Sequence, residues 1–224
     1  MDNIKLGSLL MVFFQRTIFF NPLQIKSYIK DNINYFSDSI DESQPIYPIS
    51  LQFLPLFQLN SITTPFKITV YNNRIDLFTN TDLSNEDYFD CFNRFIELGF
   101  QLAKLSTSKN ENNLCCKFGV VNNSYIEEKQ ACDIILNNYI KKKISNIENN
   151  ISISYTQIVK IDKFKSNKVD TIESAFINNH GLSISLKRDI NIKDIQNSID
   201  CKDLISYIKS TSKLLSKDQM LEML

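Results

Sequence analysis

The sequence predicts an α+β protein in which helices cover a mostly antiparallel sheet, in layers of the ferredoxin-like sandwich type. Three observations predict this class. Hydrophobic residues make up 43% of the 224 residues, which is enough to bury a core. Apolar residues alternate with a period of two in several segments and recur at helical spacing in others. Short turn sequences separate neighbouring extended segments, which favours antiparallel hairpins.

The first third of the chain is predicted to form strands around a single helix. The expected elements, in order, are a central strand over 10–20, a helix over 22–36, short or edge strands over 45–60 and a hairpin over 66–78. The first strand is apolar on both faces, as in the middle of a sheet. Pro22 suits the first turn of a helix, and prolines limit strand pairing over 45–60. Asn72 and Asn73 tolerate the positive φ of a two-residue turn.

The rest of the chain is predicted to add four helices and four strands. The expected elements are helix 85–105, strand 114–121, helix 127–148, strand 151–161, hairpin strands 169–177 and 182–192, helix 200–214 and a short helix after Ser216. Capping boxes are expected from Ser84 with Asp87 and from Ser216 with Gln219. Gly99 lies inside a helix, where glycine costs about 1 kcal/mol relative to alanine. Close packing of a neighbouring element is therefore expected at Gly99.

These elements are expected to form one α+β domain, residues 1–224. If the chain instead forms two lobes, they are 1–121 and 151–224, joined by the helix over 127–148. The chain has 25 basic and 25 acidic side chains, so its overall charge does not favour a polyanion or an acidic membrane. No apolar stretch near the start is long enough to span a membrane, and a cytoplasmic location is expected.

The cysteines and the glycines argue against several kinds of site. The chain has five cysteines and one histidine, without the C-x-x-C spacing of a zinc site. The neighbours Cys115 and Cys116 would point to opposite faces of a strand, which favours buried thiols over a disulfide or a redox pair. Gly-rich phosphate loops and the G-x-S-x-G motif do not occur in the sequence. We therefore expect no metal and no cofactor.

Three consecutive segments carry a family resemblance. Residues 66–77 read FKITVYNNRIDL, an aromatic helix follows Ser84, and residues 116–123 read CKFGVVNN. Together, over about 65 residues, they resemble a sporadically distributed, uncharacterised bacterial family with an "nRIdL" strand, an amphipathic helix and an "RlGlryiN" strand. The stretch 74–77 fits that pattern well, whereas 117–122 departs from it at most positions. The resemblance implies a small cytosolic protein carried with mobile or defence-related genes, and it provides no catalytic residue.

The favoured function is a non-enzymatic protein-binding subunit, such as a phage-defence accessory, antitoxin or immunity-type protein. Helix 85–105 carries more large apolar residues than one sheet-facing stripe needs, and the stretch 45–60 adds others between prolines. Proline removes hydrogen-bond donors, so an edge segment there would present side chains without extensive strand pairing. The partner is another protein or a second copy of the chain, and the predicted contact residues are Phe53, Leu54, Leu56 and Phe57.

RNA or DNA binding is the alternative function. Lysines between 141 and 168 are interleaved with aromatic residues, which suits contact with a nucleic-acid backbone and stacking on bases. The candidate residues are Lys141, Lys142, Lys143, Lys163, Lys165, Lys187 and Arg188. A lysine-rich helix end is also what the negative C-terminal dipole of a helix favours, without any ligand.

A small metal-independent ribonuclease is the third function considered. His180 is the one side chain whose ordinary pKa lies near neutrality, and it would act as acid and base. Lys187 or Arg188 would hold the phosphate. The competing interpretation is a solvated turn residue, because Asn-Asn-His-Gly is ordinary turn sequence.

Overall fold

A nine-stranded antiparallel sheet runs through the molecule in the order β2-β3-β4-β5-β1-β6-β9-β8-β7. The computed structural model describes residues 4–17, 22–43, 54–80, 87–108, 114–140, 151–177 and 181–224. The strands are β1 (Lys5–Gln15), β2 (Ile40–Ser43), β3 (Phe57–Asn60), β4 (Phe66–Tyr71), β5 (Arg74–Asn80), β6 (Cys115–Glu127), β7 (Ser152–Ile161), β8 (Phe164–Ile177) and β9 (Gly181–Ile192). The central pair, β1 and β6, joins strands from the two halves of the chain.

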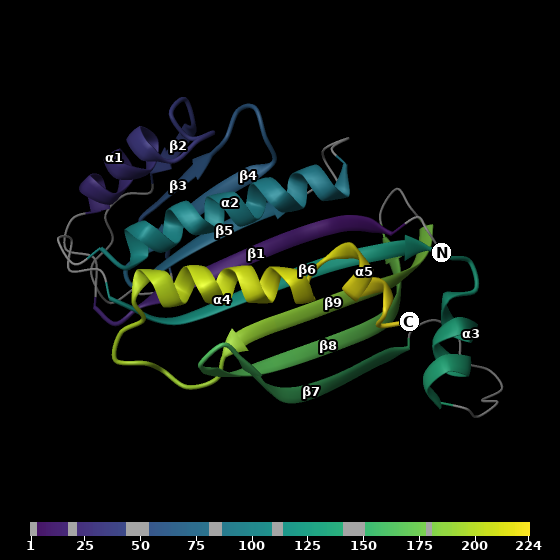
Figure 1. Cartoon of the computed structure of the whole chain (residues 1–224). Coiled ribbons are helices and arrows are strands. Elements are labelled where there is room, and N and C mark those ends of the chain that lie inside the picture. Colours follow the sequence, from purple (N-terminus) through teal and green to yellow (C-terminus); the bar gives the residue numbers. More distant parts are fainter. Residues whose placement is uncertain are drawn as a thin grey trace.

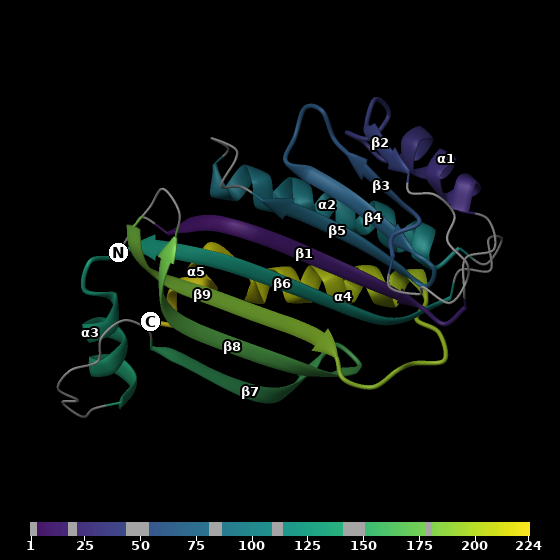
Figure 2. The same ribbon diagram turned by 180° about the vertical axis from the view of Figure 1, so that it is seen from behind.

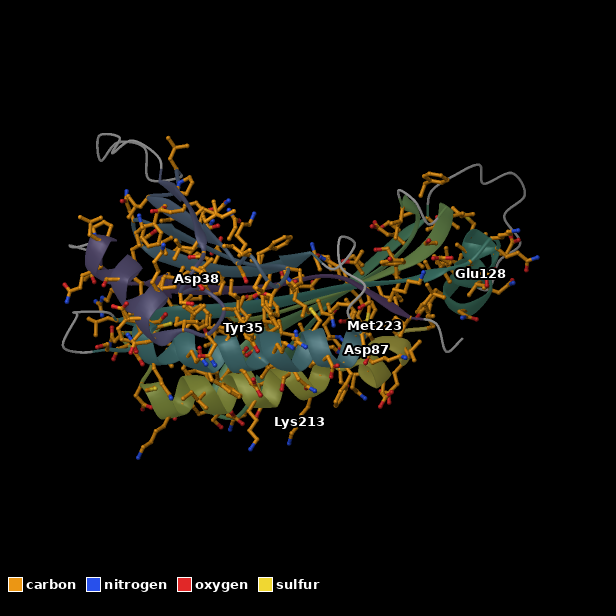
Figure 3. All side chains as sticks on the ribbon, turned by 90° about the horizontal axis from the view of Figure 1, so that it is seen from above. Tyr35, Asp38, Asp87, Glu128, Lys213 and Met223 are labelled. Atoms are coloured by element: carbon orange, nitrogen blue, oxygen red, sulfur yellow. The ribbon has the colours of Figure 1, made fainter. Side chains whose placement is uncertain are left out.

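The described helices lie on one face of this sheet (Figures 1 and 2). They are α1 (Pro22–Asn32), α2 (Tyr88–Ser106), α3 (Ala131–Ile135) with its π-helical continuation η3 (Leu136–Ile140), α4 (Cys201–Leu214) and α5 (Lys217–Leu221). Figure 3, viewed at right angles, shows α2 and α4 side by side, with Lys213 of α4 turned away from the sheet. The predicted class, an antiparallel sheet covered by helices, is confirmed.

The main hydrophobic core fills the space between the sheet and the helices. Alternation along β1 points Met11 and Phe13 towards the helices, where both are buried. Tyr207 of α4 lies edge-on to Phe118 of β6 and Phe164 of β8, with ring centroids 5.8 and 5.5 Å away. These contacts stabilise the packing of α4 on β6 and β8.

α2 approaches β1 closely because residue 99 has no side chain. A Cβ atom at Gly99 would lie 2.5 Å from Sδ of Met11 and 3.8 Å from Cγ2 of Ile208. Met11 is buried, so a close-packed core leaves its side chain little room to move away. The close packing predicted from the glycine inside this helix is confirmed.

The strands and helices begin and end at residues that differ partly from the sequence predictions. β1 begins at Lys5 instead of residue 10, and β6 continues to Glu127, so the helix expected from 127 begins only at Ala131. Residues 141–148 of that expected helix lie outside the described residues. The hairpin of β4 and β5 is confirmed, but neither Asn72 nor Asn73 has the positive φ that was expected in its turn. Gly181, the first residue of β9 in the later hairpin, has a positive φ of 76°.

The two predicted capping boxes are wrong. Ser84 lies outside the described residues. α2 begins at Tyr88, so Asp87 is its N-cap and not the third helical residue that a box with Ser84 requires, and the Asp87 side chain makes no capping hydrogen bond. Ser216 is the N-cap of α5, but its side chain makes no capping bond either. Gln219, its expected partner, donates instead to Glu222 Oε2 at 2.6 Å. Both helices are therefore held mainly by their apolar faces.

The cysteines are free thiols, and no described helix is both long and apolar enough to cross a membrane. Cys115 and Cys116 are buried at neighbouring positions of β6, as predicted. Burial raises the pKa of the Cys115 thiol far above its ordinary value, and the neighbouring Cys116 raises it further. Cys115 therefore stays protonated and unreactive.

Candidate binding face

The face of the sheet opposite the helices is the candidate functional site, and we call it the open face. No described helix covers it (Figure 2). Because side chains alternate along a strand, every second residue of each strand points to this face. On β1 these are Ser8, Leu10, Val12 and Phe14, all of them half-buried, whereas the intervening residues from Leu9 to Gln15 are buried.

Cations and aromatic rings alternate across four adjacent strands at one end of the open face. The strand register places Lys117 of β6 opposite Phe14 of β1, Phe14 opposite Arg74 of β5, and Arg74 opposite Tyr71 of β4. The Arg74 guanidinium carbon lies 4.1 Å from the centre of the Tyr71 ring and 6.0 Å from that of Phe14. All four side chains are half-buried. We call these residues the cation–aromatic row.

A carboxyl group with a raised pKa lies beside this row. Asp76 faces the open side between Val12 and Thr69, and its side chain is 13% exposed. Its Oδ1 lies 3.0 Å from Nε of Arg74, although the two buried atoms lack the geometry of a hydrogen bond. Burial raises the pKa of Asp76 to about 6, and the charge of Arg74 only partly opposes this shift. The net charge of the open face therefore changes near neutral pH.

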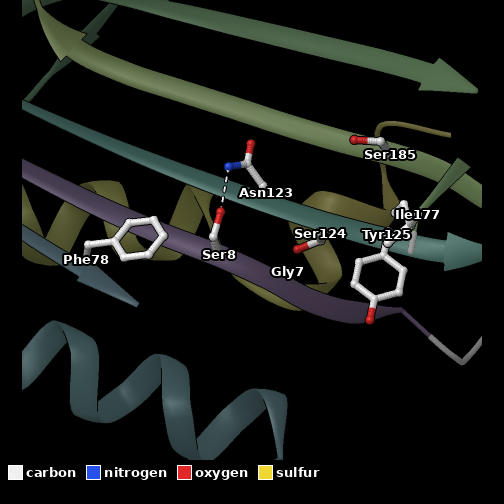
Figure 4. A pocket seen from close by; sticks show the side chains of 8 residues that line it. All are labelled: Gly7, Ser8, Phe78, Asn123, Ser124, Tyr125, Ile177 and Ser185. Atoms are coloured by element: carbon white, nitrogen blue, oxygen red, sulfur yellow. Dashed lines mark hydrogen bonds between the residues drawn. The ribbon is translucent and has the colours of Figure 1, made fainter. Parts of the chain in front are cut away.

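A hollow of about 280 Å³ lies on the open face where the pairing of β1 with β6 shifts by one residue (Figure 4). Its lining residues are Gly7, Ser8, Phe78, Asn123, Ser124, Tyr125, Ile177 and Ser185. A Cβ atom at Gly7 would lie 3.3 Å from the carbonyl oxygen of Asn123, so a side chain there would crowd β6. Asn123 Nδ2 donates to Ser8 Oγ at 2.8 Å, and the Lys67 ammonium lies 5.1 Å from the centre of the Phe78 ring. The hollow combines polar groups with an aromatic wall.

Cations outnumber anions on the open face. Lys5 and Glu127 form an ion pair on this face. Among its other described strand side chains, the cations are Lys67, Arg74, Lys117, Lys160, Lys165 and Lys187. The anions are Asp76, Asp189 and Glu173. Protonation of Asp76 would increase the positive excess further. The open face is therefore more basic than the whole chain, whose charges balance.

The residues predicted to contact nucleic acid lie in three different environments. Lys165 and Lys187 are exposed on the open face. Lys163 forms an ion pair with Asp203 of α4, on the side of the helices. Lys141, Lys142 and Lys143 lie outside the described residues.

The prediction that Arg188 contacts a phosphate is wrong, because this side chain is buried on the helix side of the sheet. Its Nε and Nη2 donate to the two carboxylate oxygens of Asp170 at 2.6 and 2.9 Å. Its Nη1 donates to the carbonyl oxygens of Leu214 and Gln219 at 2.7 and 3.2 Å. Burial alone would raise the pKa of Asp170, but the bonds and charge of Arg188 outweigh it and lower the pKa. Arg188 thus ties α4 and α5 to the sheet.

The predicted protein-contact residues are only partly accessible. Leu54 is exposed, Leu56 packs against the core, and Phe53 lies outside the described residues. Phe57 is 4% exposed because it points from β3 into the core, so its prediction as a contact residue is wrong. Most large apolar residues of α2 are buried as well, although Phe89 is exposed. These residues therefore offer a partner little continuous apolar surface.

His180, the candidate acid and base, lies outside the described residues. Within the described ranges, no cluster of His, Cys, Asp and Glu side chains could hold a metal ion.

Comparisons of the chain with protein-family models, curated protein sequences and solved structures find no match. The resemblance to a bacterial family stays a prediction.

Proposed function

We propose that the protein is a non-enzymatic binding protein that holds single-stranded nucleic acid on the open face of its sheet. The observation that carries the proposal is the cation–aromatic row. Lysine and arginine side chains neutralise phosphates, and aromatic rings stack on bases of any sequence. The row presents both kinds of group in alternation, and Lys67 with Phe78 adds a second such pair nearby.

The geometry of the row favours a single strand over a duplex. Neighbouring strands are roughly 5 Å apart, so Phe14 and Tyr71, two strands apart, are separated by roughly 10 Å. Two unstacked bases can rest on these rings only when they are not paired within a duplex. The hollow between Phe78 and Tyr125 would accept one more base or a sugar.

Reversing one charge of the row should weaken binding. We expect a labelled single-stranded RNA to bind at about 50 mM salt, and Lys117→Glu to raise its Kd about tenfold or more, because a phosphate contact becomes a repulsion. Fluorescence anisotropy measures both. Lys213→Glu is the matched control, since it makes the same charge change on the exposed side of α4 and should leave the Kd unchanged. Absence of binding at low salt, or equal losses in the two variants, would contradict the proposal.

Binding should also strengthen as the pH falls through about 6. Below its raised pKa, Asp76 is neutral and removes one negative charge from the open face, so the attraction to phosphates grows. Asp76→Asn should bind at about pH 7.5 as tightly as the wild type binds at about pH 5. The difference between the two proteins isolates Asp76 from other titrating groups. An unchanged pH profile in Asp76→Asn would exclude this carboxyl group as the cause.

Protein binding is the second candidate function, and it would use the same face. Leu10, Val12 and Val121 form a half-buried aliphatic patch at its centre, with polar side chains around it, as in many protein interfaces. An accessory, antitoxin or immunity-type role in the cytoplasm would need such a surface. A Kd that is insensitive to salt and to Lys117→Glu, measured with a captured protein partner, would favour this function over nucleic-acid binding.

A further inference from the structure

The two edges of the sheet are very different. β2 has four residues, whereas β7 has ten, Ser152–Ile161, and its pairing with β8 shows no register shift. β7 contains no proline and one charged residue, Lys160, and Ile158 is 55% exposed. Figures 1 and 2 show no described element beyond β7. Proteins normally protect such an edge by prolines, bulges, charges or a short strand, because its unpaired backbone groups can bind another strand.

We propose that β7 pairs antiparallel with β7 of a second copy of the chain, so that one sheet continues through a two-fold symmetric dimer. This proposal does not depend on what the open face binds. Antiparallel pairing of identical edges is self-complementary and closes after two copies. It provides hydrogen-bond partners for the outward N–H and C=O groups of β7 in both copies.

The backbone of β7 presents the required groups outwards. Ser174 N donates to the carbonyl oxygen of Ile151 at 2.9 Å. In this register, the odd-numbered residues of β7 are therefore the ones that form backbone hydrogen bonds with β8. Lys165, opposite Lys160, instead accepts a bond from Lys193 N at 2.9 Å through its carbonyl oxygen, on the side of β9. Because hydrogen-bonded positions alternate in antiparallel pairs, the even-numbered residues of β7 direct their N–H and C=O groups away from the sheet. A second β7 can bond to all of them.

The charges select one register for this pairing. With Thr156 on the two-fold axis, Lys160 lies opposite Ser152 of the second copy, and Ser152 pairs within its own copy with Glu173 on the open face. Within one copy Lys160 faces Lys165, an unfavourable pair of like charges. In the dimer the Lys160 ammonium can reach across the small serine to Glu173, and symmetry makes this contact twice. A second copy of the chain therefore gives Lys160 and Glu173 a partner of opposite charge at this edge.

The two-fold axis of such a pairing is perpendicular to the sheet, which determines how the copies face. Both open faces lie on the same side, and both sets of helices lie on the other. The dimer therefore doubles the area of the open face without covering the cation–aromatic row, which lies on the other side of β9 from β7.

Analytical ultracentrifugation of the full chain tests the proposal. We expect a dimer whose dissociation constant rises about 100-fold in Thr156→Pro, because proline removes one outward donor at the axis and sits well on an edge strand. Lys160→Glu should raise the dissociation constant about tenfold while placing opposite charges next to each other inside one copy. Adding Glu173→Lys to Lys160→Glu should restore the wild-type value.

A cysteine at the axis tests the register independently. Paired residues in the hydrogen-bonded position have Cα atoms about 5.5 Å apart, within the range of a disulfide, so Thr156→Cys should form an intermolecular disulfide under mild oxidation. Ser152→Cys, which faces Lys160 of the second copy, should not. The wild-type chain, oxidised in the same way, shows whether the native cysteines form intermolecular disulfides. A monomer at about 100 μM, or a dimer unaffected by Thr156→Pro and Lys160→Glu, would overturn the proposal.

Discussion

Replacing Arg188 by Met should lower the free energy of unfolding by about 3–5 kcal/mol, measured by urea denaturation. The change leaves the buried carboxylate of Asp170 without its bidentate partner. It also removes the bonds to the carbonyl oxygens of Leu214 and Gln219 that fasten α4 and α5. Lys168 Nζ, 3.2 Å from Asp170 Oδ2, and the Tyr155 hydroxyl, which donates to the same oxygen at 3.0 Å, keep the loss from being larger.

The pH dependence of this loss identifies its cause. In the wild type the pKa of Asp170 is lowered, so its stabilising effect is present above the ordinary value of 3.8 and is lost as the pH falls through the lowered pKa. In Arg188→Met the ionised carboxylate of Asp170 is buried without its partner, which lowers the free energy of unfolding. Protonation of Asp170 removes this cost. The difference in stability between the two proteins should therefore shrink as the pH falls from about 7 towards 4. A difference that is constant with pH would mean that lost packing, not the unpaired charge, causes the effect.

A double variant provides the control for charge burial. Asp170→Leu with Arg188→Met replaces the ion pair by apolar side chains, which is often neutral for stability. It should recover part of the loss of the single variant. The remainder measures the bonds to Leu214 and Gln219 together with the contacts that Lys168 and Tyr155 make with Asp170. If the double variant is less stable than Arg188→Met, this interpretation of the pair is wrong.

Tyr207→Ala should cost about 3–5 kcal/mol in the same measurement, because it opens a cavity at the centre of the core. Tyr207 is completely buried and contacts the rings of Phe118 and Phe164. Through these contacts α4 is packed on β6 and β8. The thermal midpoint should fall accordingly, by several degrees.

Tyr207→Phe separates the ring from its hydroxyl group. The hydroxyl lies 2.7 Å from Oγ of Ser166, which is itself buried, so its loss leaves one polar group unsatisfied. We expect a cost of about 1–2 kcal/mol. Equal losses in Tyr207→Phe and Tyr207→Ala would show that the hydrogen bond, not the packing of the ring, holds α4 in place.

The sequence predicts none of the four residues of the cation–aromatic row as a site residue, although it places all four in strands. These residues are Phe14, Tyr71, Arg74 and Lys117. They come together because β1 pairs with both β5 and β6, although residues 14 and 117 are far apart in the chain. Strand order is set by how apolar faces pack in three dimensions, and no local pattern along this chain specifies it.

The sequence by itself determined the class of the fold and most of its elements, because the periods of two and 3.6 are properties of the chain. It also determined the turn at Asn72 and Asn73 and the close packing at Gly99. Only the tertiary structure decided which face of each strand meets the helices. Lys187 and Arg188 are neighbours in one basic stretch, yet one is exposed on the open face and the other is buried against Asp170. Neighbouring side chains of a strand point to opposite faces of the sheet, so one of them can be exposed to solvent while the next is buried in the protein interior.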